Sequence, residues 1–300
     1  MRLFYSTFDF SRILMLTVVS CFWFFSCDSE KNYAPVDLTS EKIFSENIEG
    51  PAWRDSCWYV VNFQQDGTIG SVNPSGKVNL FVNLPAGSNA NAIQFNSKGE
   101  MLLADWPMNQ ILKVDLQTKQ VSVLIHDSIF YQPNDLTVNG RDQIFASDPD
   151  WKNVTGRIWR IDPDGTRTIL RDQMGTTNGI CLNPSEEILY VNESVQRKVW
   201  SFKVDASGNL SDPKLFASFN DYGLDGMKCD REGNLYVTRH GKGTVVVFSS
   251  DGQLVREIIL KGKKPSNLAF GGPDGRTCIV TLQDRGSIES FRTEVPGIGF

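Results

Sequence analysis

Six short apolar segments recur at nearly even spacing, and this repeat constrains the fold more than any other feature of the chain. Successive segments start 43–46 residues apart, at Trp58, Met101, Ile144, Leu189, Leu235 and Cys278. Most of them are rich in β-branched or aromatic side chains, which favour strands. A repeat of this length built from short strands is typical of the blades of a β-propeller. The sequence therefore predicts an all-β fold, a six-bladed β-propeller.

An oxygen-bearing side chain precedes each of the six segments by 9–11 residues. In chain order these side chains are Glu49, Asn91, Asn134, Asn178, Asp225 and Asn267. The first strand of each propeller blade is the innermost one, and equivalent positions in a radial fold converge on the axis. We therefore expect the six side chains to ring one central channel, at one of its two mouths.

The turn sequences within each repeat indicate four strands per blade. In the fifth repeat, turn sequences at residues 230–234, 240–243 and 249–253 separate short β-favouring segments, because Asp, Gly and Asn suit chain reversals. A propeller must also close so that no sheet edge is left unpaired. We expect residues 41–46 to pair in the last blade, which ends with residues 286–293.

Composition limits the classes of partner. The chain has 300 residues, 40% of them hydrophobic, and a formal net charge of −5. The repeat runs without an obvious linker, which favours a single domain over residues 40–300. There is no run rich in Lys and Arg, so a nucleic-acid partner is not expected. The oligomeric state is not indicated by the sequence.

The first 27 residues have the pattern of a secretory signal. Arg2 and Arg12 precede an apolar run at residues 13–25, which ends before a polar stretch. At roughly 13 residues the run is shorter than the ~20 that span a bilayer. Cys27 resembles the lipidated cysteine of a bacterial lipoprotein, with Cys21 as a second candidate. An ordinary cleaved signal also remains open. We expect an exported protein whose only membrane contact is a lipid anchor at Cys27, with residues 28–39 as a tether.

Four further cysteines, Cys57, Cys181, Cys229 and Cys278, lie in the repeat region. They show no CxxC spacing and no nearby His, so a zinc–thiolate site is not expected. Filling the core is the usual role of such residues. An even number in an exported protein permits disulfides, but the sequence does not pair them.

Several segments in register resemble the SMP-30/gluconolactonase family over residues 40–300. They are EGPAW, QPNDLTV, SDPDW, TNGICLNPSEEILYVNES, LDGMKCDREGNLYVT and FGGPDGRTCIVT, at residues 49–53, 132–138, 147–151, 177–194, 224–238 and 270–281. The resemblance implies a six-bladed propeller with one divalent cation in its central channel. It also implies that Glu49, Asn134, Asn178 and Asp225 hold that cation.

Two carboxylates and two amide oxygens form a hard donor set that suits Ca²⁺ best, with Mg²⁺, Mn²⁺ or Zn²⁺ as further options. The implied reaction is hydrolysis of a small lactone, with the cation polarising the carbonyl. The favoured acid/base is Asp225, which could contact both the metal and the reacting water. Asn134 and Asp148 are the expected substrate-binding residues.

The sequence departs from the family pattern, and other interpretations of the same residues are possible. Members that act on sugar lactones often have Arg where this chain has Gln132, so the sugar substrate is defined only as a class. Asn178 and Asp225 each precede Gly, a pairing that usually marks a turn. A phosphotriesterase-like hydrolase is a second enzymatic option. Residues 226–241 also resemble an NHL repeat, as in propellers that bind partners without catalysis.

Overall fold

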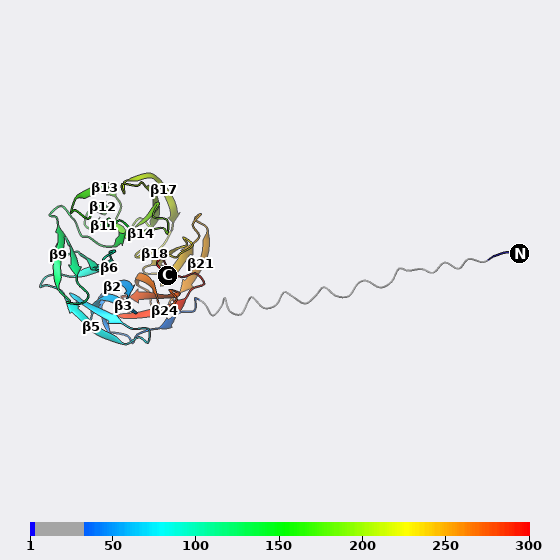
Figure 1. Cartoon of the computed structure of the whole chain (residues 1–300), viewed down its shortest axis with the longest axis horizontal. Helices are drawn as coiled ribbons and strands as arrows, with labels where there is room; N and C mark the ends of the chain where they lie inside the picture. The colour runs from blue at the N-terminus through cyan, green and yellow to red at the C-terminus, as the bar shows by residue number, and fades with distance from the viewer. Residues whose placement is uncertain (4–32) are drawn as a thin grey trace.

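A computed structural model describes residues 1–3 and 33–300 of the chain. Over these residues, 24 strands form six four-stranded antiparallel sheets arranged around a central axis (Figure 1). Each sheet is one blade, and in blades 1–5 consecutive strands run from the axis to the rim. The predicted all-β fold, a six-bladed propeller, is confirmed.

The first three blades are built from strands β2 to β13. Blade 1 contains β2 (Phe44–Arg54), β3 (Cys57–Phe63), β4 (Thr68–Val72) and β5 (Val78–Asn83). Blade 2 contains β6 (Ala90–Phe95), β7 (Met101–Asp105), β8 (Gln110–Val114) and β9 (Val121–His126). Blade 3 contains β10 (Leu136–Val138), β11 (Ile144–Asp150), β12 (Thr155–Ile161) and β13 (Arg167–Met174).

The remaining blades contain β14 to β24 together with β1. Blade 4 contains β14 (Thr177–Leu182), β15 (Ile188–Glu193), β16 (Lys198–Val204) and β17 (Leu210–Ser218). Blade 5 contains β18 (Met227–Cys229), β19 (Leu235–Arg239), β20 (Thr244–Phe248) and β21 (Leu254–Ile259). Blade 6 contains β22 (Pro265–Gly271), β23 (Thr277–Leu282), β24 (Ser287–Arg292) and β1 (Val36–Asp37).

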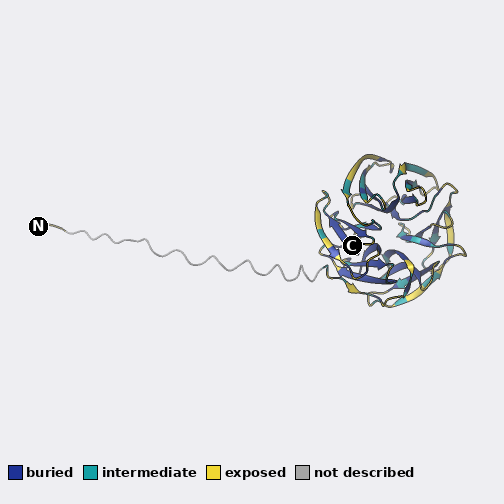
Figure 2. Ribbon diagram, turned by 180° about the vertical axis from the view of Figure 1, so that it is seen from behind, coloured by how far each residue is buried: buried dark blue, intermediate teal, exposed yellow. Residues whose placement is uncertain are grey.

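The six apolar segments found in the sequence are the second strands of the blades, and each observed strand begins within one residue of the expected start. These strands are almost fully buried because a neighbouring blade covers each of their faces. The outermost strands, such as β5 and β9, consist almost entirely of half-buried and exposed positions. Figure 2 shows the same gradient from a buried centre to an exposed rim.

Apolar side chains between neighbouring blades form the core. One cluster, for example, packs Ile93 and Leu103 of blade 2 against Val61 and Ile69 of blade 1. A corresponding cluster joins the last blade to the first, where Ile279 packs with Trp58. Each blade is therefore stabilised mainly by its two neighbours, and the site on the axis rests on all six of them.

The ring is closed by an earlier segment than the sequence predicted. Strand β1 pairs with β24, with Val36 opposite Ser290 and Asp37 opposite Glu289. Residues 44–46 instead begin β2 of blade 1, although the backbone N–H groups of Lys42 and Ile43 donate to the last blade. The propeller thus starts inside the segment 28–39 that was predicted to be a tether. A two-residue strand has no periodic pattern by which the sequence could reveal it.

The signal-like segment, Cys21, Cys27 and residues 28–32 lie outside the described residues, so the structure bears on neither export nor lipidation. In the described ranges there is no helix with the length and apolar character needed to cross a membrane.

Candidate metal centre

The predicted ring residues lie on, or directly before, the innermost strand of each blade. Glu49, Asn91, Asn178 and Asn267 belong to β2, β6, β14 and β22, whereas Asn134 and Asp225 lie two residues before β10 and β18. In β2, β6, β14 and β22, the strands that contain a ring residue, the pairing register with the second strand shifts at that residue. A bulge of this kind re-aims a side chain out of the regular ladder. The strands thereby present these side chains at one end of the channel.

Five of the six ring residues line one cavity of about 380 Å³ at this end of the channel: Glu49, Asn91, Asn134, Asn178 and Asp225. Most of the rest of the lining comes from the ends of the second strands and from the loops that follow them, whereas Gln132 lies in the segment before β10. It includes Trp106, Gln132, Trp151, Ser194, His240 and Gln283. The sequence-predicted metal ligands are therefore brought together in a single cavity.

The two amide oxygens in the predicted ligand set have no donor. The Oδ1 atoms of Asn134 and Asn178 are buried and accept no hydrogen bond within the part of the chain that the structure describes. An unpartnered buried acceptor is costly, because its hydration is lost without replacement. By contrast, Oδ1 of Asn267, which was not expected to be a ligand, accepts the N–H of Leu268 at 2.9 Å. A cation is the kind of partner that the two free oxygens lack.

The two carboxylates of the set are in an environment that disfavours their charge. Burial raises the pKa of Glu49 well above its ordinary value, and the neighbouring Asp225 and Asp135 carboxylates raise it further. Burial likewise raises the pKa of Asp225, with Asp135 adding to the rise and the Asn178 side chain partly opposing it. The N–H of Gly50 donates to Oε2 of Glu49 at 2.6 Å. A divalent cation between the two carboxylates would reverse this penalty.

Amide oxygens are needed to complete such a site. Among residues 1–3 and 33–300, no group of three or more His, Cys, Asp and Glu side chains lies close enough to hold a metal ion. The available set is thus two carboxylates and two amide oxygens, all hard oxygen donors that suit Ca²⁺ or Mg²⁺. The residues present fit a divalent cation on the chemistry of these donors and on the two unpartnered oxygens.

The glycines after Asn178 and Asp225 are required by close packing rather than by turns. A Cβ at Gly179 would lie 2.3 Å from the carbonyl oxygen of Asp225, and one at Gly226 would lie 2.0 Å from Oδ1 of Asn267. Neither glycine has a positive φ. These residues let neighbouring inner strands approach one another near the axis. The Asn178-Gly179 and Asp225-Gly226 pairs therefore belong to the ring geometry.

Asp148 does not line the cavity. Its side chain is fully buried and accepts the backbone N–H groups of Tyr131 and Gln132 at 2.7–3.1 Å. It also accepts Nε1–H of Trp159 at 2.8 Å. These bonds hold the loop that carries Gln132 and Asn134, so the structure favours a positioning role for Asp148 over the predicted contact with substrate.

Two polar side chains that the sequence did not single out hold the segment around Asp225. Asn192 Nδ2 donates to the carbonyl oxygen of Asp225, and Ser194 Oγ donates to the carbonyl oxygen of Leu224. Both come from blade 4, at the end of β15 or directly after it. Their only sequence signal is their place at the end of a buried strand or directly after it, a position that faces the next inner strand.

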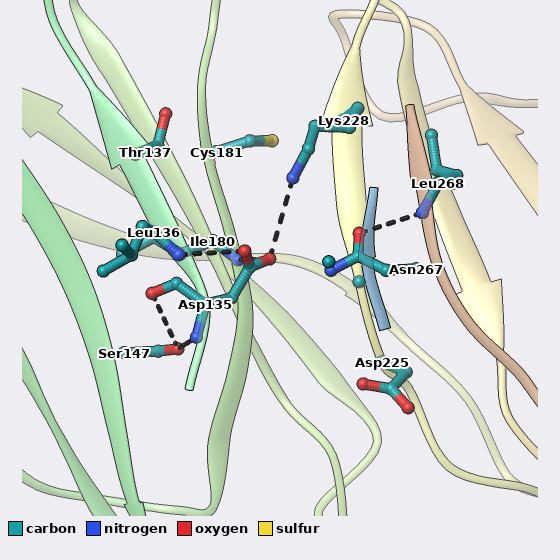
Figure 3. A network of polar contacts seen from close by, with 12 residues as sticks. Asp135, Leu136, Thr137, Ser147, Ile180, Cys181, Asp225, Lys228, Asn267 and Leu268 are labelled. Atoms are coloured by element: carbon teal, nitrogen blue, oxygen red, sulfur yellow. Dashed lines mark hydrogen bonds and ion pairs between the residues drawn. The ribbon is translucent and has the colours of Figure 1, made fainter. Parts of the chain in front are cut away.

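An ion pair between a carboxylate and a lysine lies deeper in the channel. Asp135 is buried, and its Oδ2 lies 3.8 Å from Nζ of Lys228 on β18. Its oxygens also accept the N–H of Leu136 at 2.8 Å and that of Ile180 at 3.4 Å. Figure 3 shows Asp135 and Lys228 facing each other, with Asp225 further along the channel. Asp135 directly follows the predicted ligand Asn134, but the sequence around it did not indicate that it would pair with Lys228.

The far ends of the inner strands line another cavity, of about 270 Å³. Its lining includes Trp53, Phe95, Cys181, Lys228, Cys229 and Phe270. Since the inner strands run side by side along the axis, their starts line the polar cavity and their ends line this more apolar one. The two cavities therefore lie at opposite ends of the channel.

Comparison with known proteins places the chain in a family. The sequence profile of the SMP-30/Gluconolactonase/LRE-like region matches residues 49–284. A gluconolactonase of Zymomonas mobilis is 26% identical over 285 residues, covering 82% of this chain and 78% of that protein.

Two solved structures share the fold. A gluconolactonase of Xanthomonas campestris matches with a TM-score of 0.76 and 22% identity, over 91% of this chain and 94% of that one. Regucalcin of Agrobacterium tumefaciens, described as a calcium-binding protein, matches with a TM-score of 0.76 and 21% identity, over 87% and 94%. The propeller, the motif order and the profile match agree: the chain belongs to the SMP-30/gluconolactonase/LRE-like family.

Proposed function

We propose that this protein is a divalent-metal-dependent lactonase whose active site is the polar cavity of the propeller channel. The observation that carries the proposal is the convergence of Glu49 and Asp225 with the unpartnered Oδ1 atoms of Asn134 and Asn178. The family, and a relative named gluconolactonase, support lactone hydrolysis as the reaction. The donor set supports Ca²⁺ as the favoured ion, with Mg²⁺, Mn²⁺ or Zn²⁺ as alternatives.

Glu49, Asn134, Asn178 and Asp225 would hold the cation. When bound, the cation would polarise the lactone carbonyl and stabilise the negative charge that develops on its oxygen. Asp225 then acts as the base, because its carboxylate lines the cavity and can accept a proton from the attacking water. The Asn134 side chain, held by the loop that Asp148 anchors, can donate its amide N–H to the substrate.

The lining of the cavity favours a neutral substrate. Among the described residues that line it there is neither Lys nor Arg, and burial lowers the pKa of His240, which favours the neutral imidazole. Gln132 offers a neutral amide. Trp106 and Trp151 are 37% and 41% exposed at the mouth, where indole faces can pack on the C–H faces of a sugar ring. The expected substrates are therefore uncharged lactones, with aldonolactones as the leading class.

The test is acid release from a panel of lactones by chelator-stripped protein, before and after addition of each metal ion. The panel pairs glucono-1,5-lactone with its anionic 6-phospho derivative and with an aliphatic lactone, and spontaneous hydrolysis is subtracted. We expect metal-dependent release that prefers the uncharged lactones. Asp225→Asn should reduce it by at least ~10³-fold, whereas the exposed-turn control Asp251→Asn should match the wild type.

Two results would contradict the proposal. Full activity in Asp225→Asn would remove this residue from the mechanism. Metal binding without release from any lactone would leave the cavity as a binding site. Phosphotriesters and non-covalent ligands would then be assayed next.

A further inference from the structure

The second cavity brings together two cysteines that the sequence could not pair. Cys181 of β14 and Cys229 of β18 are both buried, and their Sγ atoms lie 3.9 Å apart. Both thiols line the 270 Å³ cavity at the end of the channel opposite the proposed metal centre. Figure 3 shows Cys181 at this level of the channel, beside Lys228. Neither cysteine takes part in the proposed reaction.

The backbones that carry the two thiols are held close together. A Cβ at Gly179 would lie 2.3 Å from the carbonyl oxygen of Asp225 and 3.0 Å from the backbone nitrogen of Met227. The two inner strands run in the same direction. Cys181 comes two residues after Gly179, and Cys229 comes two residues after Met227. The strand register therefore places the cysteines opposite each other, as a disulfide requires.

The other cysteines of the repeat region have different surroundings. Cys57 is half-buried, and its thiol donates to the carbonyl oxygen of Arg54. Cys278 is fully buried in the apolar cluster between blades 5 and 6. Among the described residues, Cys181 and Cys229 are the two whose sulfurs are in contact.

We propose that Cys181 and Cys229 form a reversible disulfide that joins the inner strands of blades 4 and 5. The electron acceptor is a small disulfide such as oxidised glutathione. One cysteine thiolate attacks the glutathione S–S bond and releases one glutathione thiolate. The second cysteine then attacks the mixed disulfide and releases the other. The two cysteine protons end on the two glutathione thiols, and the pair of electrons has reduced the glutathione disulfide.

The site reacts most readily before the fold is complete. Contact with Cys181, together with burial, raises the pKa of the Cys229 thiol well above its ordinary value, so little thiolate is present in the folded protein. Once formed, the bond would brace the strand that carries Asn178 against the segment that carries Asp225. By restricting the unfolded chain, it should raise the melting temperature by ~5 °C.

The test uses the full chain, unfolded under reducing conditions and refolded in buffers of varied ratio of oxidised to reduced glutathione. Free thiols are trapped with an alkylating agent, and the protein is digested with trypsin. The expected product under oxidising conditions is a linked pair of peptides covering residues 172–197 and 229–231. The melting temperature should rise with the linked fraction and fall again after reduction.

Variants separate this bond from general oxidation. Cys181→Ala should abolish both the linked peptides and the redox-dependent shift in melting temperature, whereas Cys57→Ala should retain both. If Cys181→Ala does not fold, the peptide map of the wild type decides alone. Folded protein from oxidising buffer with Cys181 and Cys229 both alkylated, or with either linked to another cysteine, would overturn the proposal. These measurements are independent of lactonase activity.

Discussion

The two ends of the propeller channel are built from the same six strands but differ in how their polar groups are satisfied. At one end, no Lys or Arg among the described residues forms an ion pair with the carboxylates of Glu49 and Asp225, and two amide oxygens accept no hydrogen bond from these residues. Deeper in the channel, toward the other end, the buried carboxylate of Asp135 has Lys228 and two backbone N–H groups. The carboxylates at the first end therefore require a cation from outside the chain, whereas Lys228 provides the positive charge for Asp135.

This difference shows how one repeat can serve both binding and stability. The bulges that turn ring side chains toward the axis cost ladder hydrogen bonds. Beyond the bulges the strands pair regularly, and their side chains pack or pair with one another. A binding site at the start of the strands is thus supported by a self-sufficient structure at their ends.

The largest effect should come from removing a charge at the unsatisfied end. Glu49→Gln keeps the shape of the side chain but removes one of two carboxylates, so Ca²⁺ affinity should fall on the order of 100-fold. Isothermal titration calorimetry on chelator-stripped protein measures this change, and excess metal should restore activity. Glu46→Gln, an exposed change on the same strand, is the matched control. Equal affinity in Glu49→Gln and wild type would exclude Glu49 as a ligand.

A smaller effect is expected at the self-paired end, in stability rather than in metal binding. Lys228→Met removes the cation beside Asp135, whose side chain is only 3% exposed. We expect the free energy of unfolding to fall by about 2 kcal/mol, since a buried charge loses its partner. Urea unfolding measures the loss.

The double variant Asp135→Asn with Lys228→Met distinguishes a lost ion pair from lost packing. If the pair matters, the double variant should recover most of the stability, because no unpaired charge remains. Strictly additive losses would show that Lys228 acts only through the packing of its methylene groups.

Much of the ring could be predicted from the sequence, because equal spacing in a radial fold determines convergence without any contact information. Glu49, Asn134, Asn178 and Asp225 were expected together, and they line one cavity. Whether an oxygen is free could not be predicted, since Asn178 and Asn267 occupy equivalent positions in the repeat, but only Oδ1 of Asn267 accepts a local N–H. That contact depends on strand geometry within a few tenths of an ångström.

Other features depend on contacts between separate strands and loops, which spacing does not encode. Asp148 lies on β11, and its orientation toward the 131–134 loop follows from three N–H donors, two in that loop and one on β12 of the same blade. The Lys228–Asp135 pair and the Cys181–Cys229 contact join different blades. The closing strand β1 was missed because two residues at a sheet edge carry no periodic signal.

The last expected effect is a pH dependence of stability at the unsatisfied end. Burial raises the pKa of Glu49 and Asp225 in the metal-free folded protein above the ordinary values of 4.5 and 3.8. The folded state therefore binds protons more tightly than the unfolded chain. The stability due to these protons is fully present below the ordinary values and is lost as pH rises through the raised ones.

Carboxylates with a lowered pKa, such as Asp274 beside Arg292, act in the opposite direction, so the total stability profile mixes both signs. Subtracting the profile of Glu49→Gln cancels those contributions. In chelator, the wild type should lose stability relative to Glu49→Gln as pH rises above the ordinary value of 4.5 and through the raised pKa of Glu49. Saturating Ca²⁺ should flatten this difference, because the ion favours ionised carboxylates at every pH in the range. A difference that does not vary with pH in chelator would mean that Glu49 is already compensated within the chain, and the contrast between the two ends of the channel would fail.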